Sequence, residues 1–208
     1  MRAIGIDFGT TNSAVALAEA DGRVRSLSWP SADGDVGVFR TALAFWSEGR
    51  MPRATLHSAG GPQALEHVLE HPGDGRFVQS IKTYLGSRGF TETRLYGRRF
   101  GIEDLVATFL GHLAPERHAL LGGASGVVAG RPVVFAGERP DEALAVKRLG
   151  AAFTQAGFGE VALAFEPLGA AYWYARDLAR DETVLVADFG GGTSDFSVMR
   201  FTRVSVVR

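Results

Sequence analysis

The first thirty residues follow a hydrophobic pattern that is typical of short strands. Arg2–Phe8 is a mostly apolar run that stops at the turn former Gly9, as expected of a buried strand. Ser13–Glu19 alternates small and apolar residues, and an Asp-Gly pair at 21–22 is a strong hairpin signal before a third run, Arg23–Trp29. The sequence therefore predicts that the chain begins as an antiparallel meander.

Helical periodicity appears in the middle of the chain. The clearest stripe lies before Pro115, which should end the helix because a proline ring clashes with the preceding turn. Further helices are expected over Gly60–His71, after Asp141, whose carboxylate suits an N-cap, and from Glu166-Pro167, where proline stands near the first helical position. The two clearest apolar faces consist of Ile102, Leu105, Val106, Phe109, Leu110 and Leu113, and of Ala145, Leu149, Ala152 and Ala156.

Short apolar runs separate these helices and continue beyond the last one. A buried strand over Thr183–Ala187 should turn at Asp188–Thr193 and return over Ser194–Phe201. Alternating strands and helices predict an α/β fold, in which a mixed sheet with an antiparallel meander is flanked by helices. The other expected strands are Thr41–Trp46, Ser125–Ala129, Pro132–Phe135 and Val161–Phe165, and a peripheral loop or hairpin is expected over Arg88–Phe100.

The first and last hairpins repeat one pattern. Each has a hydrophobic strand that ends in Asp-Phe-Gly, at Asp7 and at Asp188, followed by a turn rich in glycine and threonine and then a second strand. The two aspartates lie 181 residues apart, so the repeat indicates two similar lobes rather than a solenoid. A single copy could be an ordinary hairpin, but two copies in corresponding positions favour a shared chemical role.

Phosphate binding explains the residue types in these turns. Glycine lets backbone N–H groups approach a phosphate closely, and successive N–H groups form an anion-binding nest. An aspartate beside a phosphate makes sense with an intervening Mg²⁺, held through water. Asp-Phe-Gly also occurs as the magnesium motif of protein kinases. That interpretation fails because the chain has no glycine-rich kinase loop and no His-Arg-Asp catalytic loop.

Composition narrows the choice of function. The 208 residues are 46% apolar and 22% charged, with a net charge of −1, so no basic excess points to nucleic acid or to an anionic membrane. There is no cysteine, which excludes disulfides and thiolate metal sites and fits a reducing cytoplasm. No signal peptide is expected, and no apolar stretch approaches the ~20 residues of a membrane span. Lys82 and Lys147 are the two lysines among many arginines, and either could be a solvated surface residue.

Four segments resemble the nucleotide-binding domain of DnaK-type heat-shock 70 kDa chaperones, which belong to the actin-like ATPase superfamily with its ribonuclease H-like lobes. Gly5–Ser13 is similar to the first phosphate motif of that family and Asp188–Asp195 to the second. Phe165–Ala171 resembles the connecting motif, and Ser80–Gly86 the lysine segment. Two departures, at Asn12 and at Gly130–Val133, make the chain more similar to the divergent YegD-like members.

This resemblance implies a role for each matching residue. Asp7, Glu166 and Asp188 would hold a hydrated Mg²⁺, and Asp195 would lie near the metal and its waters. Lys82 would approach the γ-phosphate and the attacking water, where a mobile point charge suits a crowded site. ATP would be hydrolysed by positioning and charge stabilisation, without a covalent intermediate. Donors to the phosphates would come from Gly9, Thr10, Thr11 and Asn12 on one side, and from Gly190, Gly191, Gly192 and Thr193 on the other.

The resemblance also sets expectations for domains and partners. Residues 1–182 would form the first lobe, with a small peripheral subdomain inserted at about 36–101, and 183–208 would begin a second lobe that is cut short, so we expect this fragment to have little activity by itself. Unfolded client proteins and co-chaperones would be the partners of the full-length protein. Two other functions stay open: a structural ATPase of the actin or MreB kind, and a sugar or acetate kinase of the same superfamily.

Overall fold

A mixed β-sheet forms the centre of the structure. The computed structural model describes residues 2–49, 54–122, 124–191 and 194–202, and this part of the chain builds a sheet with the order β11-β10-β1-β2-β3, in which β4 also pairs with β2. β1 runs parallel to β10 and antiparallel to β2, so the sheet joins the N-terminal meander to later strands. The bounds are β1 Arg2–Phe8, β2 Asn12–Ala18, β3 Val24–Ser26, β4 Phe39–Arg40, β10 Ala124–Arg131 and β11 Ala162–Phe165.

The predicted meander is confirmed, with a shorter third strand. β1 and β2 pair from Ala3 opposite Ala18 to Phe8 opposite Ser13, whereas β3 keeps three residues, all exposed. The strand predicted at Pro132–Phe135 is wrong, because the chain is irregular after β10. A proline has no N–H to donate to a ladder, and Phe135 enters the core from this loop instead.

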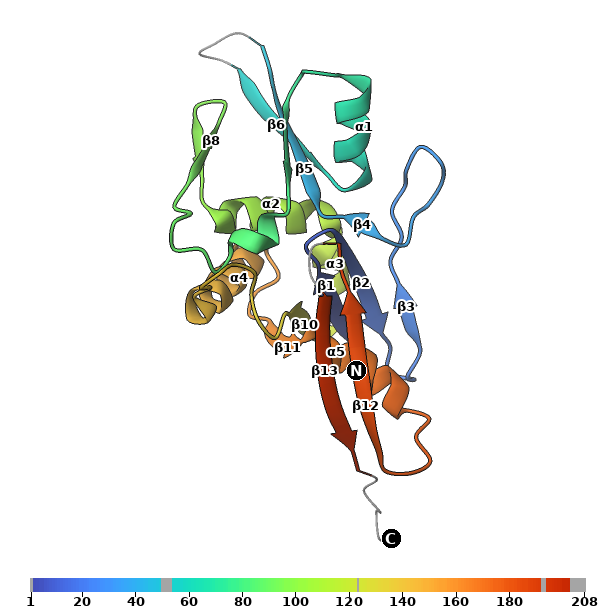
Figure 1. Cartoon of the computed structure of the whole chain (residues 1–208). Coiled ribbons are helices and arrows are strands. Elements are labelled where there is room, and N and C mark those ends of the chain that lie inside the picture. The colour runs from blue at the N-terminus through green and yellow to red at the C-terminus, as the bar shows by residue number, and fades with distance from the viewer. Residues whose placement is uncertain (1, 50–53, 123, 192–193, 203–208) are drawn as a thin grey trace.

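A smaller sheet lies above the central one in Figure 1 and carries a helix on one side. Its central strand, β5, contributes the four consecutive buried residues 42–45, which explains the strong apolar signal there. The polar segment before residue 101 forms a separate two-stranded hairpin. The bounds are β5 Ala42–Glu48, β6 Thr55–Gly60, β7 Arg76–Gln79, α1 Pro62–Glu70, β8 Thr93–Leu95 and β9 Arg98–Phe100.

The helices follow the predicted periodicity closely. α2 (Ile102–Leu113) buries all six residues of the predicted stripe, and it packs against α4 (Glu142–Gln155). Asp141 caps α4 as predicted, because its carboxylate accepts the N–H of Leu144 at 2.9 Å. α5 (Glu166–Ala175) begins at the predicted Glu-Pro pair. A short helix, α3 (Arg117–Leu121), has no counterpart among the predicted elements.

Aromatic rings tie the strands to α2. The ring centroid of Phe109 lies 5.5 Å from that of Phe8 on β1 and 5.6 Å from that of Phe39 on β4. Trp29 packs on Phe39, and its indole N–H donates to the carbonyl of Leu113 at 2.8 Å. This core holds β1 rigidly, and the carboxyl end of β1 carries Asp7.

The last two described strands form a sheet of their own. β12 (Glu182–Phe189) and β13 (Ser194–Phe201) pair antiparallel and contact α5, and they are drawn in front of the central sheet in Figure 1. The predicted strands are therefore confirmed, but the burial expected of Thr183–Ala187 is wrong, since exposed and half-buried residues alternate along β12. Among the described residues nothing covers its outer face, where Leu185, Phe189, Phe196 and Val198 are exposed.

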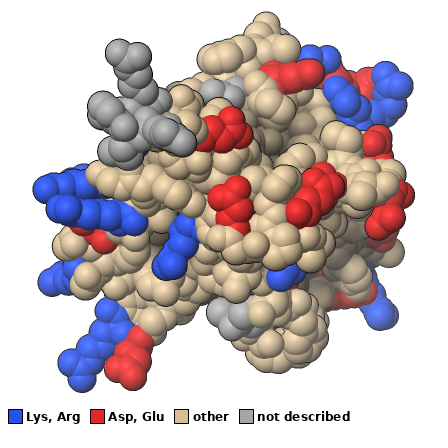
Figure 2. Space-filling model, turned by 90° about the horizontal axis from the view of Figure 1, so that it is seen from above, with Lys and Arg blue, Asp and Glu red and all other residues tan. Residues whose placement is uncertain are grey.

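Surface charge is mixed on the face shown in Figure 2. Basic and acidic side chains are both scattered over this face, most of it is uncharged, and side chains of opposite sign touch at its lower left. In the part of the chain that the structure describes, no helix has both the length and the apolarity needed to cross a bilayer.

Candidate functional site

A cleft of about 230 Å³ opens where the first and last hairpins meet. Its walls come from the turn after β1, the segment after β7, the loop after β10, the start of α5 and the turn after β12. The described residues predicted to bind phosphate or metal, or to act in catalysis, all line it: Asp7, Gly9, Thr10, Thr11, Asn12, Lys82, Glu166, Asp188, Gly190, Gly191 and Asp195. Gly192 and Thr193 lie outside the described residues.

Close backbone packing fixes the first turn. A Cβ on Gly9 would clash with the carbonyl oxygen of Asn12, so this turn conformation requires glycine. The carbonyl of Thr11 accepts the N–H of Thr41 at 2.8 Å, and the hydroxyls of Ser13 and Thr41 lie 2.9 Å apart in a buried contact. The turn between β1 and β2 is thus anchored to the segment that leads into β5.

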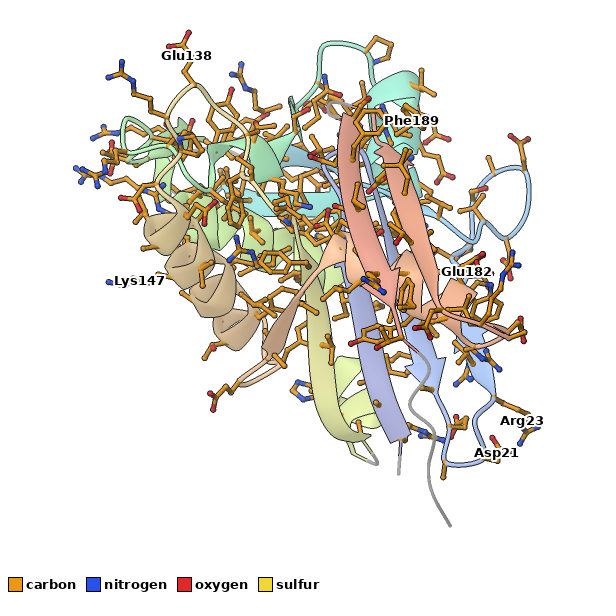
Figure 3. The ribbon with its side chains drawn as sticks, turned by 60° about the horizontal axis from the view of Figure 1, so that its bottom comes forward. Asp21, Arg23, Glu138, Lys147, Glu182 and Phe189 are labelled. Carbon is orange, nitrogen blue, oxygen red and sulfur yellow. The ribbon has the colours of Figure 1, made fainter. Side chains whose placement is uncertain are left out.

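The second turn touches the first directly. A Cβ on Gly191 would clash with the side chain of Thr11, so the two turns approach as closely as a glycine allows. Asp188 and Asp195 are paired in register across β12 and β13, which brings both carboxylates to the cleft end of the hairpin. Figure 3 shows Phe189 at the same end. The two similar hairpins therefore face a common cleft.

A partly buried ion pair lies in this cleft. Lys82 Nζ donates to Glu166 Oε1 at 2.5 Å, although the residues are 84 positions apart. Lys82 comes from the short 3₁₀ helix η1 (Ile81–Tyr84), and Glu166 is the first residue of α5. Their side chains are 6% and 18% exposed. The alternative that Lys82 is a solvated surface lysine is therefore wrong, whereas Lys147 is exposed on α4 and points outward in Figure 3.

Negative charge dominates the cleft. Four carboxylates and one ammonium group line it, from Asp7, Glu166, Asp188, Asp195 and Lys82. Burial raises the pKa of Asp7, with Lys82 opposing and Asp188 reinforcing the rise. Burial likewise raises the pKa of Glu166, and the charges of Asp7 and Asp188 raise it further. Lys82 opposes this rise through its charge and its hydrogen bond. A bound cation would relieve this repulsion.

The donor set suits a hydrated cation rather than a metal held by many side chains. Among the described residues no three His, Asp or Glu side chains lie close enough together to form a metal-binding group. Mg²⁺ usually keeps several waters and takes its other ligands from one or two carboxylates and substrate phosphates. The excess of carboxylates and the glycine-rich turns fit Mg²⁺ bound together with a polyphosphate.

Some lining residues were not predicted to bind a ligand. Thr83 and Phe189 are direct neighbours of predicted residues, so their positions were open to inference. The loop Pro132–Ala136 reaches the cleft through Pro132, Val134, Phe135 and Ala136. It follows the carboxyl end of β10, which lies parallel to β1, and loops at the carboxyl ends of parallel strands commonly form ligand sites. The parallel pairing of β1 with β10 could have indicated that this loop lines the cleft, but the sequence did not predict that pairing.

Comparison with solved structures identifies the fold. The chain matches MreB5 of Spiroplasma citri bound to ADP with a TM-score of 0.58 and 19% identity, covering 97% of this chain and 49% of that one. This likeness establishes the fold, which is that of the actin-like ATPases, as predicted. No protein-family model matches the sequence.

Sequence comparison points to one family. The chain is 31% identical over 198 residues to the chaperone protein DnaK of Thermotoga petrophila, covering 94% of this chain and 30% of that protein. It is 30% identical over 201 residues to DnaK of Endomicrobium trichonymphae, covering 94% of this chain and 29% of that protein. The predicted resemblance to DnaK-type chaperones is thus confirmed: the chain is homologous to them over almost its whole length and spans about three tenths of theirs.

Proposed function

We propose that this chain carries the phosphate-binding part of an ATP-hydrolysing nucleotide-binding domain in a DnaK-like chaperone. One observation carries the proposal: two glycine-rich turns from repeated hairpins meet beside an ion pair between the buried Lys82 and the half-buried Glu166. Backbone N–H groups in such turns bind phosphate, and carboxylates behind them bind the accompanying metal ion. The homology to DnaK supports ATP as the polyphosphate.

The two turns would bind the phosphates from opposite sides. Gly9, Thr10, Thr11 and Asn12 would donate to one side of the β- and γ-phosphates. Gly190 and Gly191, with Gly192 and Thr193, would donate from the other. Mg²⁺ would supply neutralisation of the phosphate charge, and Asp7, Glu166 and Asp188 would hold it through its water shell. Asp195 would orient those waters.

Lys82 would act on the reacting phosphate. Its ammonium group is held by Glu166, so little reorganisation is needed before it donates to a γ-phosphate oxygen or to the attacking water. Preorganised charge of this kind stabilises the charge that develops in phosphoryl transfer. Glu166 also holds the lysine in place, because an ammonium group without a partner in this position would be costly.

The wider arrangement forms part of the same proposal. Residues 1–182 would be the first lobe, with the subdomain at about 36–101 inserted, and 183–208 the start of the second. The two-stranded sheet β12–β13, which is separate from the central sheet, supports that division. Homology to DnaK supports unfolded proteins and co-chaperones as partners and a cytoplasmic location. Asn12 and Gly130–Val133 support a YegD-like subgroup.

A filament-forming ATPase is the second candidate, because MreB5 shares the fold. The insertion around Arg76–Phe100, the position of Lys82 and the Glu166-Pro167 pair favour the chaperone branch. A small-molecule kinase would need an acceptor-binding loop between the lobes, and no segment of the sequence suggests one.

The ATPase rate of the intact protein tests the proposal. Lys82→Ala should lower kcat by about 100-fold or more, the scale on which positioned charge contributes to catalysis. Lys147→Ala removes the exposed lysine and should leave the rate unchanged. Equal rates for Lys82→Ala and the unmodified protein would refute the assignment. ATP-dependent light scattering by filaments would favour the MreB-like alternative, and phosphorylation of an added metabolite would favour the kinase.

A further inference from the structure

One arginine outside the cleft binds the main chain of residues 84–90, which follow Lys82. Arg148 lies on α4, next to the exposed Lys147, and its side chain is 11% exposed. Its guanidinium donates to four main-chain carbonyls of one stretch of chain: Tyr84 at 3.4 Å, Leu85 at 3.1 Å, Ser87 at 2.8 Å and Phe90 at 2.9 Å. This stretch begins at the last residue of η1, the helix on which Lys82 lies.

Other contacts make the attachment rigid. Glu103 on α2 lies 3.4 Å from Arg148 Nε and balances its charge. The carbonyl of Gly86 accepts the N–H of Asp141 at 2.9 Å, and Arg88 pairs with the same aspartate at 2.7 Å. Residues 84–90, which follow Lys82, are therefore docked on the N-terminal half of α4. Inside the segment, Leu85 N–H donates to the Lys82 carbonyl at 3.2 Å, which links the docked part to the lysine.

We propose that Arg148 is a positioning residue for the reaction, which sets the location of the Lys82 ammonium group by fixing the main chain that follows it. The inference rests on the proposed ATPase function. Arg148 does not line the cleft, so it acts through Lys82 rather than on the nucleotide. A flexible lysine stem depends on the placement of its backbone, and small displacements of catalytic groups cost large factors in rate.

The geometry requires arginine. A planar guanidinium presents its donors as a rigid fork, which here serves four carbonyls and one carboxylate at once. A lysine has three donors at one point and could not serve the same set. Arg148→Lys would keep the charge near Glu103 and lose part of the docking.

A double-mutant cycle on the intact protein tests this inference through steady-state ATP hydrolysis. Arg148→Ala should lower kcat by about 10-fold or more while the KM for ATP changes by less than about threefold, since the lost interaction matters in the transition state. The kcat of Arg148→Lys should lie between those of Arg148→Ala and the unmodified protein, and the kcat of Lys147→Ala should equal that of the unmodified protein. In a Lys82→Ala background, Arg148→Ala should lower the rate no further, because both act through one group.

Two outcomes would overturn the inference. One is an Arg148→Ala variant with an unchanged kcat. The other is an equal fractional loss with and without Lys82, which would indicate a general effect on folding. Thermal unfolding of each variant accompanies the kinetics, and if Arg148→Ala does not fold, the same comparison is made with Arg148→Lys. A Lys82→Ala variant with full activity refutes the proposed function instead, so the two failures are distinguishable.

Discussion

Removing the charge of Lys82 should expose the electrostatic strain in the cleft. In Lys82→Met the stem volume is kept, but Glu166 loses its partner while Asp7 and Asp188 remain. Breaking a fully buried ion pair by removing one partner costs about 3–5 kcal/mol. Because the Glu166 side chain is 18% exposed and borders a cleft, we expect a smaller loss, about 1–3 kcal/mol of unfolding free energy near neutral pH.

The loss should depend on pH in a defined direction. Burial raises the pKa of Glu166, and Lys82 is the main influence that lowers it, so Lys82→Met raises it further. An acid whose folded pKa exceeds its unfolded value contributes stability that is complete below the unfolded value and is lost as pH rises through the folded one. Lys82→Met should therefore be much closer to the unmodified protein at about pH 5 than at about pH 8.

Urea unfolding midpoints at both pH values measure this effect. Lys147→Met makes the same substitution at the exposed lysine of α4 and should change the midpoint little at either pH. Adding Glu166→Gln to Lys82→Met should restore much of the stability at the higher pH, since it removes the unpaired carboxylate. A destabilisation that is equal at both pH values, or equal for the two lysines, would refute the electrostatic reasoning.

Three further predictions concern the turns and the core. Gly191→Ala should push the second turn away from Thr11 and weaken Mg²⁺-dependent ATP binding about 10-fold, or ~1.4 kcal/mol, in isothermal titration. Gly169→Ala on α5, where a Cβ meets open space, should leave the affinity for ATP unchanged. Trp29→Phe should cost about 1–3 kcal/mol of unfolding free energy, because it leaves the buried Leu113 carbonyl without its donor, and an unchanged urea midpoint would count against that bond. Burial lowers the pKa of His112, so its contribution to stability is present above about pH 6.5 and lost in acid, and His112→Gln should flatten that part of the pH dependence of the thermal midpoint.

Local patterns were sufficient for the parts of the fold that depend on neighbouring residues. The meander, the stripe of α2 and the Asp141 cap were all predicted, because periodicity and capping are properties of short segments. The apolar residues of Pro132–Phe135 predict a strand, although the segment starts with a proline. The exposure of β12 depends on which elements pack over it, and a hydrophobic run in the sequence does not show whether such elements are present.

The candidate site was predicted as a set of residues, not as an arrangement. The repeat and the family motifs identified Asp7, Lys82, Glu166 and Asp188, but the pairing of Lys82 with Glu166 joins positions 84 residues apart. Arg148 was missed altogether. A single arginine on a helix carries no motif, and its partners are main-chain carbonyls, which every sequence has.

Amide chemical shifts test the central claim most directly. On titrating Mg²⁺-ATP into the ¹⁵N-labelled protein, the N–H resonances of Gly9, Thr10 and Thr11 should move together with those of Gly190 and Gly191, with one common dissociation constant and a requirement for Mg²⁺. That result would mean that both turns bind the same polyphosphate. A response confined to one turn, or shifts that avoid both, would contradict the account.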